Sequence, residues 1–325
     1  MSGRPRVLVM HPILDPGPAI LGDAAEVVAY PSNRPLDQQN IREAADGCLG
    51  IVSQLKDPIG PVVLSTPGLR CVSNVAVGFD NIDVPTATAN HVWVTNTPGV
   101  LDDATSDFAF ALLMAVARRI VQGDGFVRQG NFRGWEIDMM LGADVHDATL
   151  GIVGIGRIGR GLARRAKGFN MRVLYSDTNP LMPEVEQQLG ATHVDLPRLL
   201  TESDYISLHV PLTKDTHHLI SGPQLAQMKP TAILINTSRG PVIDEAALVE
   251  ALKSHRIGGA GLDVYEREPS IHPGLIGLHN VVLAPHIASA TTRTRSEMSA
   301  MAARNMATAV RGGRPPNVLN PEARK

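Results

Sequence analysis

The chain has 325 residues and a formal net charge of −2, with 30 Lys and Arg residues against 32 Asp and Glu residues. This balance, with no long run of either sign, argues against a nucleic-acid partner or a membrane surface. Two cysteines, Cys48 and Cys71, are too few for a disulfide framework and favour a reducing compartment. Because no apolar run reaches membrane-spanning length, we expect a soluble cytoplasmic protein, large enough for two cores and without a metal site.

The first third of the chain predicts a small parallel sheet. Short β-prone segments alternate with helical or loop segments, a pattern typical of a sheet covered by helices on both faces. The β-prone segments are residues 6–10, 27–29, 50–52, 70–73 and 92–95.

A turn follows the fourth of these segments, at residues 75–83 (VAVGFDNID). Gly78 lies beside Asn81 and Asp83, so backbone N–H groups of this turn could face a ligand carboxylate. Read alone, however, the same residues fit an ordinary strand-to-helix loop better than a ligand site.

A long, mostly apolar helix is predicted over residues 105–128. A helix that is apolar on most sides must be buried in a core or against a second subunit. We interpret it as the crossover between two domains and as part of a homodimer contact. An irregular segment, residues 131–147, follows and carries Trp135, one of only two tryptophans.

Residues 148–177 (ATLGIVGIGRIGRGLARRAKGFNMRVLYSD) read as strand, glycine turn, helix and strand. Gly154, Gly156 and Gly159 form G-x-G-x-x-G between an apolar strand and a helix whose N-terminus would face phosphates. Asp177 ends the second strand, roughly 20 residues later, where a carboxylate can accept hydrogen bonds from an adenosine ribose. The combination predicts a Rossmann dinucleotide site, whereas the glycines alone would be weak evidence.

The alternation then continues to the C-terminus. Further strands are predicted at residues 205–209, 232–236, 259–264 and 281–284, and helices at 244–253 and 294–310. The fold class we expect is therefore α/β, with two doubly wound parallel-sheet domains, a flavodoxin-like substrate domain and a Rossmann domain. We place the substrate domain at residues 1–99 plus 290–325 and the dinucleotide-binding domain at 100–289.

Three residues near predicted strand ends, Arg239, Glu268 and His286, suit hydride transfer to a ketone. Histidine can give a proton to the developing alkoxide, and arginine can hold a carboxylate through two parallel hydrogen bonds. An acid beside the histidine would stabilise its imidazolium form and fix its orientation. Taken singly, each residue also fits a structural or solvated role.

Five ordered motifs together resemble the D-isomer-specific 2-hydroxyacid dehydrogenase family. They are VGFDNID at 77–83, the glycine motif, NTSRG at 236–240, GLDVYEREP at 261–269 and APHIAS at 284–289. The resemblance implies that Arg239 anchors the substrate carboxylate, that His286 is the acid/base and that Glu268 is its partner. It also implies a substrate clamp from the backbone of Val77 and Gly78. The cofactor contacts expected on this basis are Thr105, Gly154, Gly156, Arg157, Ile158, Gly159, Asp177, Val210, Pro211, Thr237, Ser238 and Asp263.

Within that family, residues 133–145 and 148–159 are most similar to glyoxylate/hydroxypyruvate reductases. The similarity implies reduction of a small 2-keto acid, glyoxylate or hydroxypyruvate, to the D-2-hydroxy acid, and Asp177 favours NADH as the cofactor. The similarity also implies that Trp135 reaches into a neighbouring subunit's pocket and that Leu55 forms an apolar pocket wall. Two residues depart from the pattern: Asp177-Thr178 replaces a Ser-Arg pair common in NADPH-dependent members, and Ala288 replaces a glycine.

Other activities remain open on the sequence. A D-3-phosphoglycerate dehydrogenase or another D-2-hydroxyacid dehydrogenase would share the same trio. A corepressor-like module, which senses NAD and binds partners, would share the fold as well.

Overall fold

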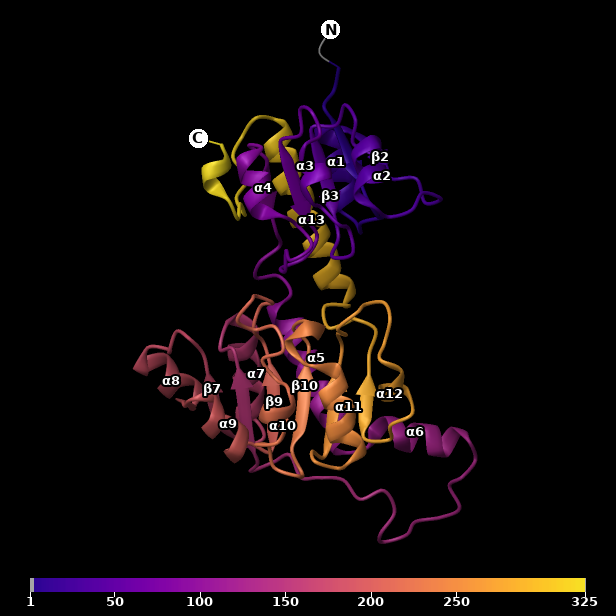
Figure 1. The fold of residues 1–325 in the computed structure, drawn as a ribbon, viewed down its shortest axis with the longest axis vertical. Coiled ribbons are helices and arrows are strands. Elements are labelled where there is room, and N and C mark those ends of the chain that lie inside the picture. The colour runs from indigo at the N-terminus through magenta and orange to yellow at the C-terminus, as the bar shows by residue number, and fades with distance from the viewer. Residues whose placement is uncertain (1–2, 325) are drawn as a thin grey trace. The chain divides into compact units, whose positions relative to one another are not determined.

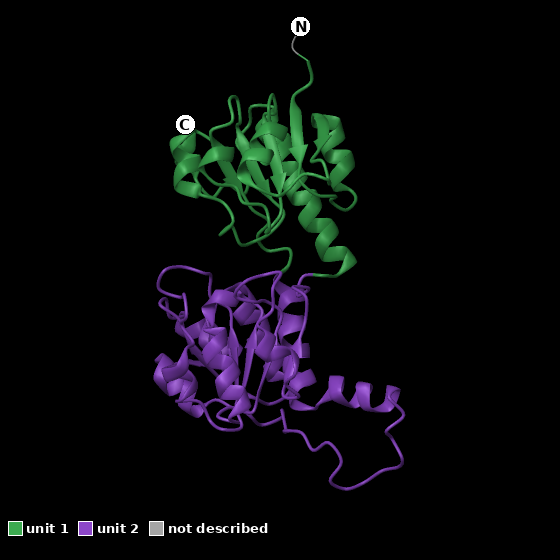
Figure 2. Cartoon of the chain, turned by 45° about the vertical axis from the view of Figure 1, so that its right-hand side comes forward, with its two compact units in different colours: residues 1–101, 290–325 green, residues 102–289 purple. Residues whose placement is uncertain are grey.

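The computed structural model describes residues 3–324, and the chain divides into two compact units (Figure 2). Unit 1 combines the N-terminal part, up to Leu101, with the C-terminal part from Ala290 onward. Unit 2 comprises Asp102–Ser289. Each unit is an α/β body built on one parallel sheet, as the alternating sequence pattern predicts.

The sheet of unit 1 has five parallel strands in the order β2-β1-β3-β4-β5. Its central strands are buried on both faces, which explains their continuous apolar sequences. Leu8 packs in the cluster on one face, whereas Val7 and Val9 pack in the cluster on the other. The strands are β1 (Arg6–Val9), β2 (Glu26–Ala29), β3 (Gly50–Ser53), β4 (Cys71–Asn74) and β5 (Trp93–Thr95).

Helices cover both faces of this sheet (Figure 1). The C-terminal helix α13 (Thr292–Val310) returns to unit 1 and contributes Met306 to the same cluster as Val7 and Val9. The Ser73 hydroxyl donates to the carbonyl of Ala302 on α13 at 2.9 Å, tying that helix to β4. The other helices are α1 (Gly17–Ala24), α2 (Gln38–Ala44), α3 (Pro61–Leu64), α4 (Val84–Ala89) and the 3-10 turn η2 (Pro321–Ala323).

The sheet of unit 2 has seven parallel strands in the order β12-β11-β10-β9-β6-β7-β8. The order reverses between β6 and β9, which is the point where dinucleotides bind in folds of this type. The strands are β6 (Thr149–Val153), β7 (Arg172–Ser176), β8 (Ala191–His193), β9 (Tyr205–Leu208), β10 (Ile233–Asn236), β11 (Gly259–Leu262) and β12 (Val281–Leu283).

Unit 2 has helices on both faces of its sheet (Figure 1). They are α5 (Asp102–Ala117), α6 (Ile120–Arg128), α7 (Arg157–Lys167), α8 (Pro183–Leu189), α9 (Leu196–Glu202), α10 (Gly222–Leu225), α11 (Glu245–Lys253), α12 (Pro273–Ile276) and the 3-10 turn η1 (Gly240–Val242). Among the described residues, no helix is long and apolar enough to cross a bilayer.

The single buried helix predicted for residues 105–128 is wrong, because the chain breaks into α5 and α6. Arg119 adopts a left-handed backbone with φ of 53°. The N–H of Ala143 donates to the Ala117 carbonyl at 2.9 Å and takes the acceptor that a continuing helix would need. Only α5 is buried; α6 has no buried residue and stands out from the body of unit 2 (Figure 2).

Candidate active site

The three predicted catalytic residues follow three neighbouring strands of unit 2. Arg239 follows β10, Glu268 follows β11 and His286 follows β12. Because β10, β11 and β12 run parallel and adjacent, these residues come from the same carboxyl edge of the sheet.

The structure brings Glu268 and His286 into contact. The imidazole Nδ1 lies 2.9 Å from the Oε2 atom of the carboxylate, and the two side chains are 32% and 37% exposed. The other ring nitrogen, Nε2, is therefore left for a reacting group. His286 has φ of 56°, a left-handed conformation that non-glycine residues rarely adopt and that clusters at functional sites.

Glu268 is held in its ionised form. Burial alone would raise the pKa of its carboxyl group, but the hydrogen bond and charge of His286 outweigh burial and lower it. The N–H of Tyr265, which donates to Oε1 at 3.1 Å, and the nearby charge of Arg239 act in the same direction. A carboxylate in this position stabilises a protonated imidazole beside it.

A compact turn positions Arg239. Asn236, almost fully buried at the end of β10, donates from its side-chain amide to the Arg239 carbonyl at 2.9 Å. Its side-chain oxygen accepts the N–H and hydroxyl of Ser238. One guanidinium nitrogen of Arg239 donates to the Ser238 carbonyl at 2.8 Å. The turn therefore fixes the backbone from which the guanidinium projects.

Asp263, which follows β11, supports the loop that carries His286. Its two carboxylate oxygens accept the N–H groups of Ile287 and Ala288 at 2.7 and 2.8 Å. The side chain is fully buried, and burial raises its pKa. Asp263 was predicted as a cofactor contact, and in this structure both of its oxygens already bond the backbone that follows His286.

A second histidine near this sheet edge, His209, is unsuited to acid–base work. Burial lowers its pKa to about 4, so the ring is neutral near pH 7. Its Nε2 atom lies 2.9 Å from the Ser207 hydroxyl, within hydrogen-bond distance. A ring that is neutral near pH 7 cannot supply the proton, so His209 is not a candidate for the proton donor.

The glycine turn has the shape that a dinucleotide requires. Gly154 has φ of 93°, and a Cβ there would lie 2.8 Å from the His209 backbone. A Cβ on Gly159 would lie 2.3 Å from the Gly154 carbonyl oxygen, so the third glycine allows the helix to approach the strand. A Cβ on Gly156 would instead enter open space at the N-terminus of α7, where a pyrophosphate would rest.

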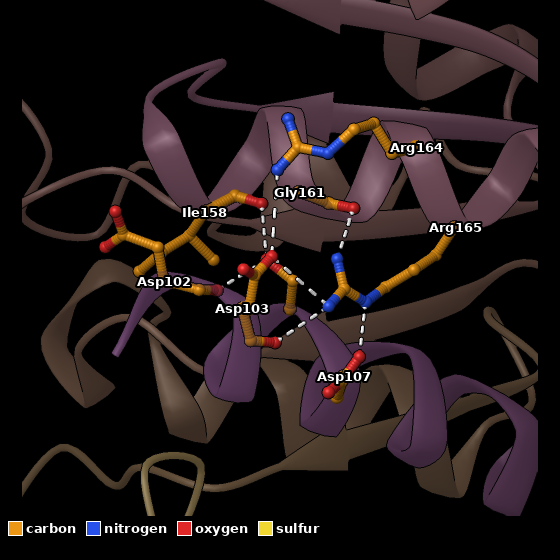
Figure 3. A network of polar contacts seen from close by, with 8 residues as sticks. Asp102, Asp103, Asp107, Ile158, Gly161, Arg164 and Arg165 are labelled. Carbon is orange, nitrogen blue, oxygen red and sulfur yellow. Dashed lines mark hydrogen bonds and ion pairs between the residues drawn. The ribbon is translucent and has the colours of Figure 1, made fainter. Parts of the chain in front are cut away.

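Polar contacts between α5 and α7 hold this helix in place (Figure 3). The Ser106 hydroxyl donates to the Ile158 carbonyl at 2.9 Å. Arg165 on α7 donates to the carboxylate of Asp107 at 2.5 Å and to the carbonyls of Gly161 and Asp103. The first turn of α7, which carries the predicted phosphate-binding N–H groups, is thereby fixed against α5.

Two further features fit a bound dinucleotide. Asp177 accepts the N–H of Ile155 at 2.8 Å and that of Asn179 at 2.9 Å, so its carboxylate lies beside the glycine turn. The Thr237 hydroxyl is buried without a hydrogen-bond partner among the described residues. Of the other predicted contacts, Arg157 and Ile158 open α7, Val210 and Pro211 follow β9, Ser238 follows β10, and Thr105 is buried on α5.

The predicted substrate clamp lies in unit 1, at the carboxyl ends of β3 and β4. Asn74 donates to the Gly78 carbonyl at 2.9 Å and to the Asn81 side-chain oxygen at 3.1 Å. Asn81 donates in turn to the carbonyls of Gln54 and Asp57, both at 3.0 Å. This network ties the loop of Val77 and Gly78 to the loop that carries Leu55.

Trp135 lies in the segment that follows α6 and is 77% exposed. Ile137 and Leu141 are 79% and 68% exposed in the same segment. Several large apolar side chains thus lie on a part of unit 2 that stands away from its core (Figure 2).

Sequence reasoning did not identify the residues that support the trio. The Tyr265 hydroxyl donates at 2.8 Å to the Ala284 carbonyl, two residues before His286. Glu245, which is buried, accepts the N–H of Glu266 at 2.7 Å and braces the same loop from α11. Tyr265 lies inside a quoted motif, but only the adjacency of β11 and β12 shows what its hydroxyl contacts.

A family model described as D-isomer specific 2-hydroxyacid dehydrogenase, NAD binding domain, matches residues 110–288. The chain is also 51% identical over 326 residues to a glyoxylate reductase of Korarchaeum cryptofilum, covering 99% of this chain and 98% of that relative. The chain belongs to the D-isomer specific 2-hydroxyacid dehydrogenase family, whose NAD-binding domain implies a nicotinamide dinucleotide cofactor.

Solved structures agree with this assignment. A glyoxylate reductase from Paecilomyes thermophila has a TM-score of 0.88 and 32% identity, covering 99% of both chains. An NADPH-dependent glyoxylate/hydroxypyruvate reductase from Sinorhizobium meliloti, in complex with NADP and malonate, has the same score and identity, covering 99% of this chain and 98% of that one. The chain is thus similar to reductases of small 2-keto acids.

Proposed function

We propose that this protein reduces glyoxylate or hydroxypyruvate to the corresponding D-2-hydroxy acid with NADH. The observation that carries the proposal is the contact between His286 Nδ1 and Glu268 Oε2, on the sheet edge that also bears Arg239. Relatives that match almost the whole chain are named glyoxylate reductases, which supports this substrate class.

The dinucleotide supplies the hydride when it is bound. Arg239 holds the substrate carboxylate and polarises the adjacent carbonyl, because a guanidinium can donate two parallel hydrogen bonds. His286 donates a proton from Nε2 to the carbonyl oxygen as negative charge develops there. Glu268 stabilises the imidazolium form and, by binding Nδ1, aims Nε2 at the substrate. In the oxidative direction His286 takes the proton back.

Asp177 supports NADH as the preferred cofactor. A carboxylate beside the adenosine ribose accepts from the 2′-hydroxyl and repels a 2′-phosphate. The S. meliloti enzyme is named as NADPH-dependent, so membership of the family does not by itself set the cofactor preference. Arg172 does not offset the charge of Asp177, because its guanidinium pairs with Glu202 at 2.6 Å.

We also infer a homodimer in which the segment carrying Trp135 completes the neighbouring substrate pocket. An exposed apolar segment of this size needs cover, and a second copy of the chain would provide it. A cytoplasmic location remains a prediction from the two unpaired cysteines.

Initial rates with NADH and a panel of glyoxylate, hydroxypyruvate, 3-phosphohydroxypyruvate and pyruvate test the proposal. We expect the highest kcat/KM for glyoxylate or hydroxypyruvate. A preference for 3-phosphohydroxypyruvate would instead indicate a phosphoglycerate dehydrogenase. Tight NADH binding without turnover of any acid would indicate an NAD-sensing binding module.

A further inference from the structure

Unit 1 contains a cavity of about 780 Å³ that the proposed reaction does not use. Its lining comes from unit 1 alone and includes the apolar residues Val9, Leu21 and Val27. Volumes of this size are typical of pockets for small molecules. The space is much larger than a two-carbon keto acid needs, so it is not sized for a second molecule of glyoxylate.

The cavity lies where folds of this topology bind ligands. In the order β2-β1-β3-β4-β5, the connections reverse direction between β1 and β3. His11 follows β1 and Lys56 follows β3, and both side chains line the cavity. Ligands of doubly wound sheets bind at the carboxyl ends of strands beside such a reversal.

The cavity is also distinct from the predicted substrate clamp. Leu55, Val77 and Gly78 do not line it, and no lining residue comes from β4 or the loop that follows β4. The lining instead extends away from β4, across β1 to the edge strand β2 and the loop after β2.

The charged groups of the lining are all cationic or can become cationic. They are His11, Arg34 and Lys56, and no Asp or Glu lines the cavity. The His11 ring is fixed by Asp57, whose fully buried carboxylate lies 2.7 Å from Nε2. Arg34 pairs only at 3.4 Å with Glu43, at the surface, while Lys56 forms no ion pair within residues 3–324.

The remaining lining is mostly apolar, and the loop that closes it is fixed. The Tyr30 hydroxyl donates to the Pro35 carbonyl at 2.7 Å, and the N–H of Arg34 donates to the Pro31 carbonyl at 3.1 Å. Val27 is 45% exposed on β2, so the cavity can be reached from solvent. A ligand that combines an anionic group with an apolar body would match this lining.

We propose that this cavity is a second binding site, for an aliphatic carboxylic acid larger than the substrate. The carboxylate would lie at Lys56 and His11, and the hydrocarbon chain would cover Val9, Leu21 and Val27. Binding at this site requires neither the cofactor nor the residues that we place in catalysis.

Calorimetric titration of the full-length protein with sodium octanoate tests the proposal. Saturating NADH and oxalate are kept in the cell, so that the proposed active site is filled. Octanol, which has the same hydrocarbon chain without the charge, is the matched control ligand. The variants are Lys56→Glu and Val27→Asp, both at exposed positions, with Lys253→Glu on α11 of unit 2 as the control.

We expect saturable binding of one octanoate per chain and much weaker binding of octanol. Lys56→Glu should weaken octanoate binding about fivefold or more, since an attraction is replaced by a repulsion. Val27→Asp should weaken it similarly, and Lys253→Glu should bind as the wild type does. A crystal soaked in octanoate should show its carboxylate beside Lys56.

The proposal is overturned if the wild type gives only non-saturating heats or if octanol binds as tightly as octanoate. It is also overturned if Lys56→Glu and Val27→Asp, shown by circular dichroism to be folded, bind octanoate normally. If octanoate binds only when oxalate is left out of the cell, it occupies the catalytic site, and the second site is refuted. Because these readouts do not depend on turnover, an error in the proposed activity would leave them unaffected.

Discussion

Replacing Glu268 by Gln should shift the pH dependence of keto-acid reduction to lower pH. Glu268 is ionised near neutral pH, since the hydrogen bond from His286, the Tyr265 N–H and the charge of Arg239 together lower its pKa despite burial. Reduction requires protonated His286, so its rate falls as pH rises and the imidazolium is lost. Removing the carboxylate destabilises the imidazolium, and the fall should then begin at lower pH.

The size of this shift follows from the contact. A hydrogen bond to a charged group contributes about 1.5–3 kcal/mol, and an exposed ion pair about 0.2–1 kcal/mol. With Nδ1 and Oε2 2.9 Å apart and both side chains about one third exposed, the pair lies between these cases. Loss of such a contact should therefore move the falling limb toward lower pH by an amount that a pH profile can resolve.

The assay is the pH profile of kcat/KM for glyoxylate reduction, measured alongside glycolate oxidation. Oxidation requires the neutral ring, so in the variant the rise of the oxidation rate with pH should also begin at lower pH. Glu266→Gln is the matched control, because that carboxylate lies 3.2 Å from His218 and not at the catalytic histidine. An unshifted limb in Glu268→Gln, or an equal shift in Glu266→Gln, would refute the assigned pair.

Three further predictions concern the cofactor and the assembly. Gly156→Ala should keep the wild-type Tm but weaken NADH binding about tenfold or more, whereas Gly159→Ala should destabilise the fold by about 1–3 kcal/mol, because its Cβ would overlap the Gly154 carbonyl. Calorimetry measures the stability of each variant, and NADH titration measures its affinity. Normal NADH binding by Gly156→Ala would contradict the placement of the pyrophosphate at Gly156. Asp177→Ser combined with Thr178→Arg should move the kcat/KM preference toward NADPH, and comparable wild-type values for the two cofactors would contradict our reading of Asp177. Light scattering should show a dimer at micromolar concentration, and Trp135→Ala should raise KM for glyoxylate more than Kd for NADH; a wild-type monomer would remove the basis for a shared site.

Patterns within short segments predicted the parts of the fold that depend on neighbouring residues in the sequence. The glycine turn could be read directly from its spacing between a strand and a helix. Gly154 and Gly159 leave no room for a Cβ, whereas Gly156 borders open space. Central strands such as β6 and β10 were apparent as apolar runs, since both faces of each sheet are covered. The edge strand β8 was missed because only Ala191 in it is buried, so it lacks that pattern.

The break between α5 and α6 could not be read from periodicity. Apolar residues continue past Ala117, and Ile120, Val121 and Val127 on α6 are exposed instead of packed in the core. What ends α5 is a hydrogen bond from Ala143, a residue far along the chain, to the Ala117 carbonyl. A window of neighbouring residues carries no information about such a contact.

The candidate site depends both on local sequence patterns and on contacts between distant residues. Strand-end positions and residue chemistry suggested Arg239, Glu268 and His286 as a trio for hydride transfer, and the family resemblance strengthened that hypothesis. Their alignment depends on contacts between strands, among which Tyr265 is central. Its N–H donates to Glu268, and its hydroxyl donates to the Ala284 carbonyl before His286.

Tyr265 also contacts the loop of Arg239. A Cβ on Gly240, next to Arg239, would lie 1.8 Å from the Tyr265 carbonyl carbon, so the two backbones are in direct contact. One residue thus links the loops of Arg239, Glu268 and His286. Because these links are hydrogen bonds and packing within unit 2, the proposed acid–base pair is already organised without substrate, which leaves little reorganisation for the proposed reaction.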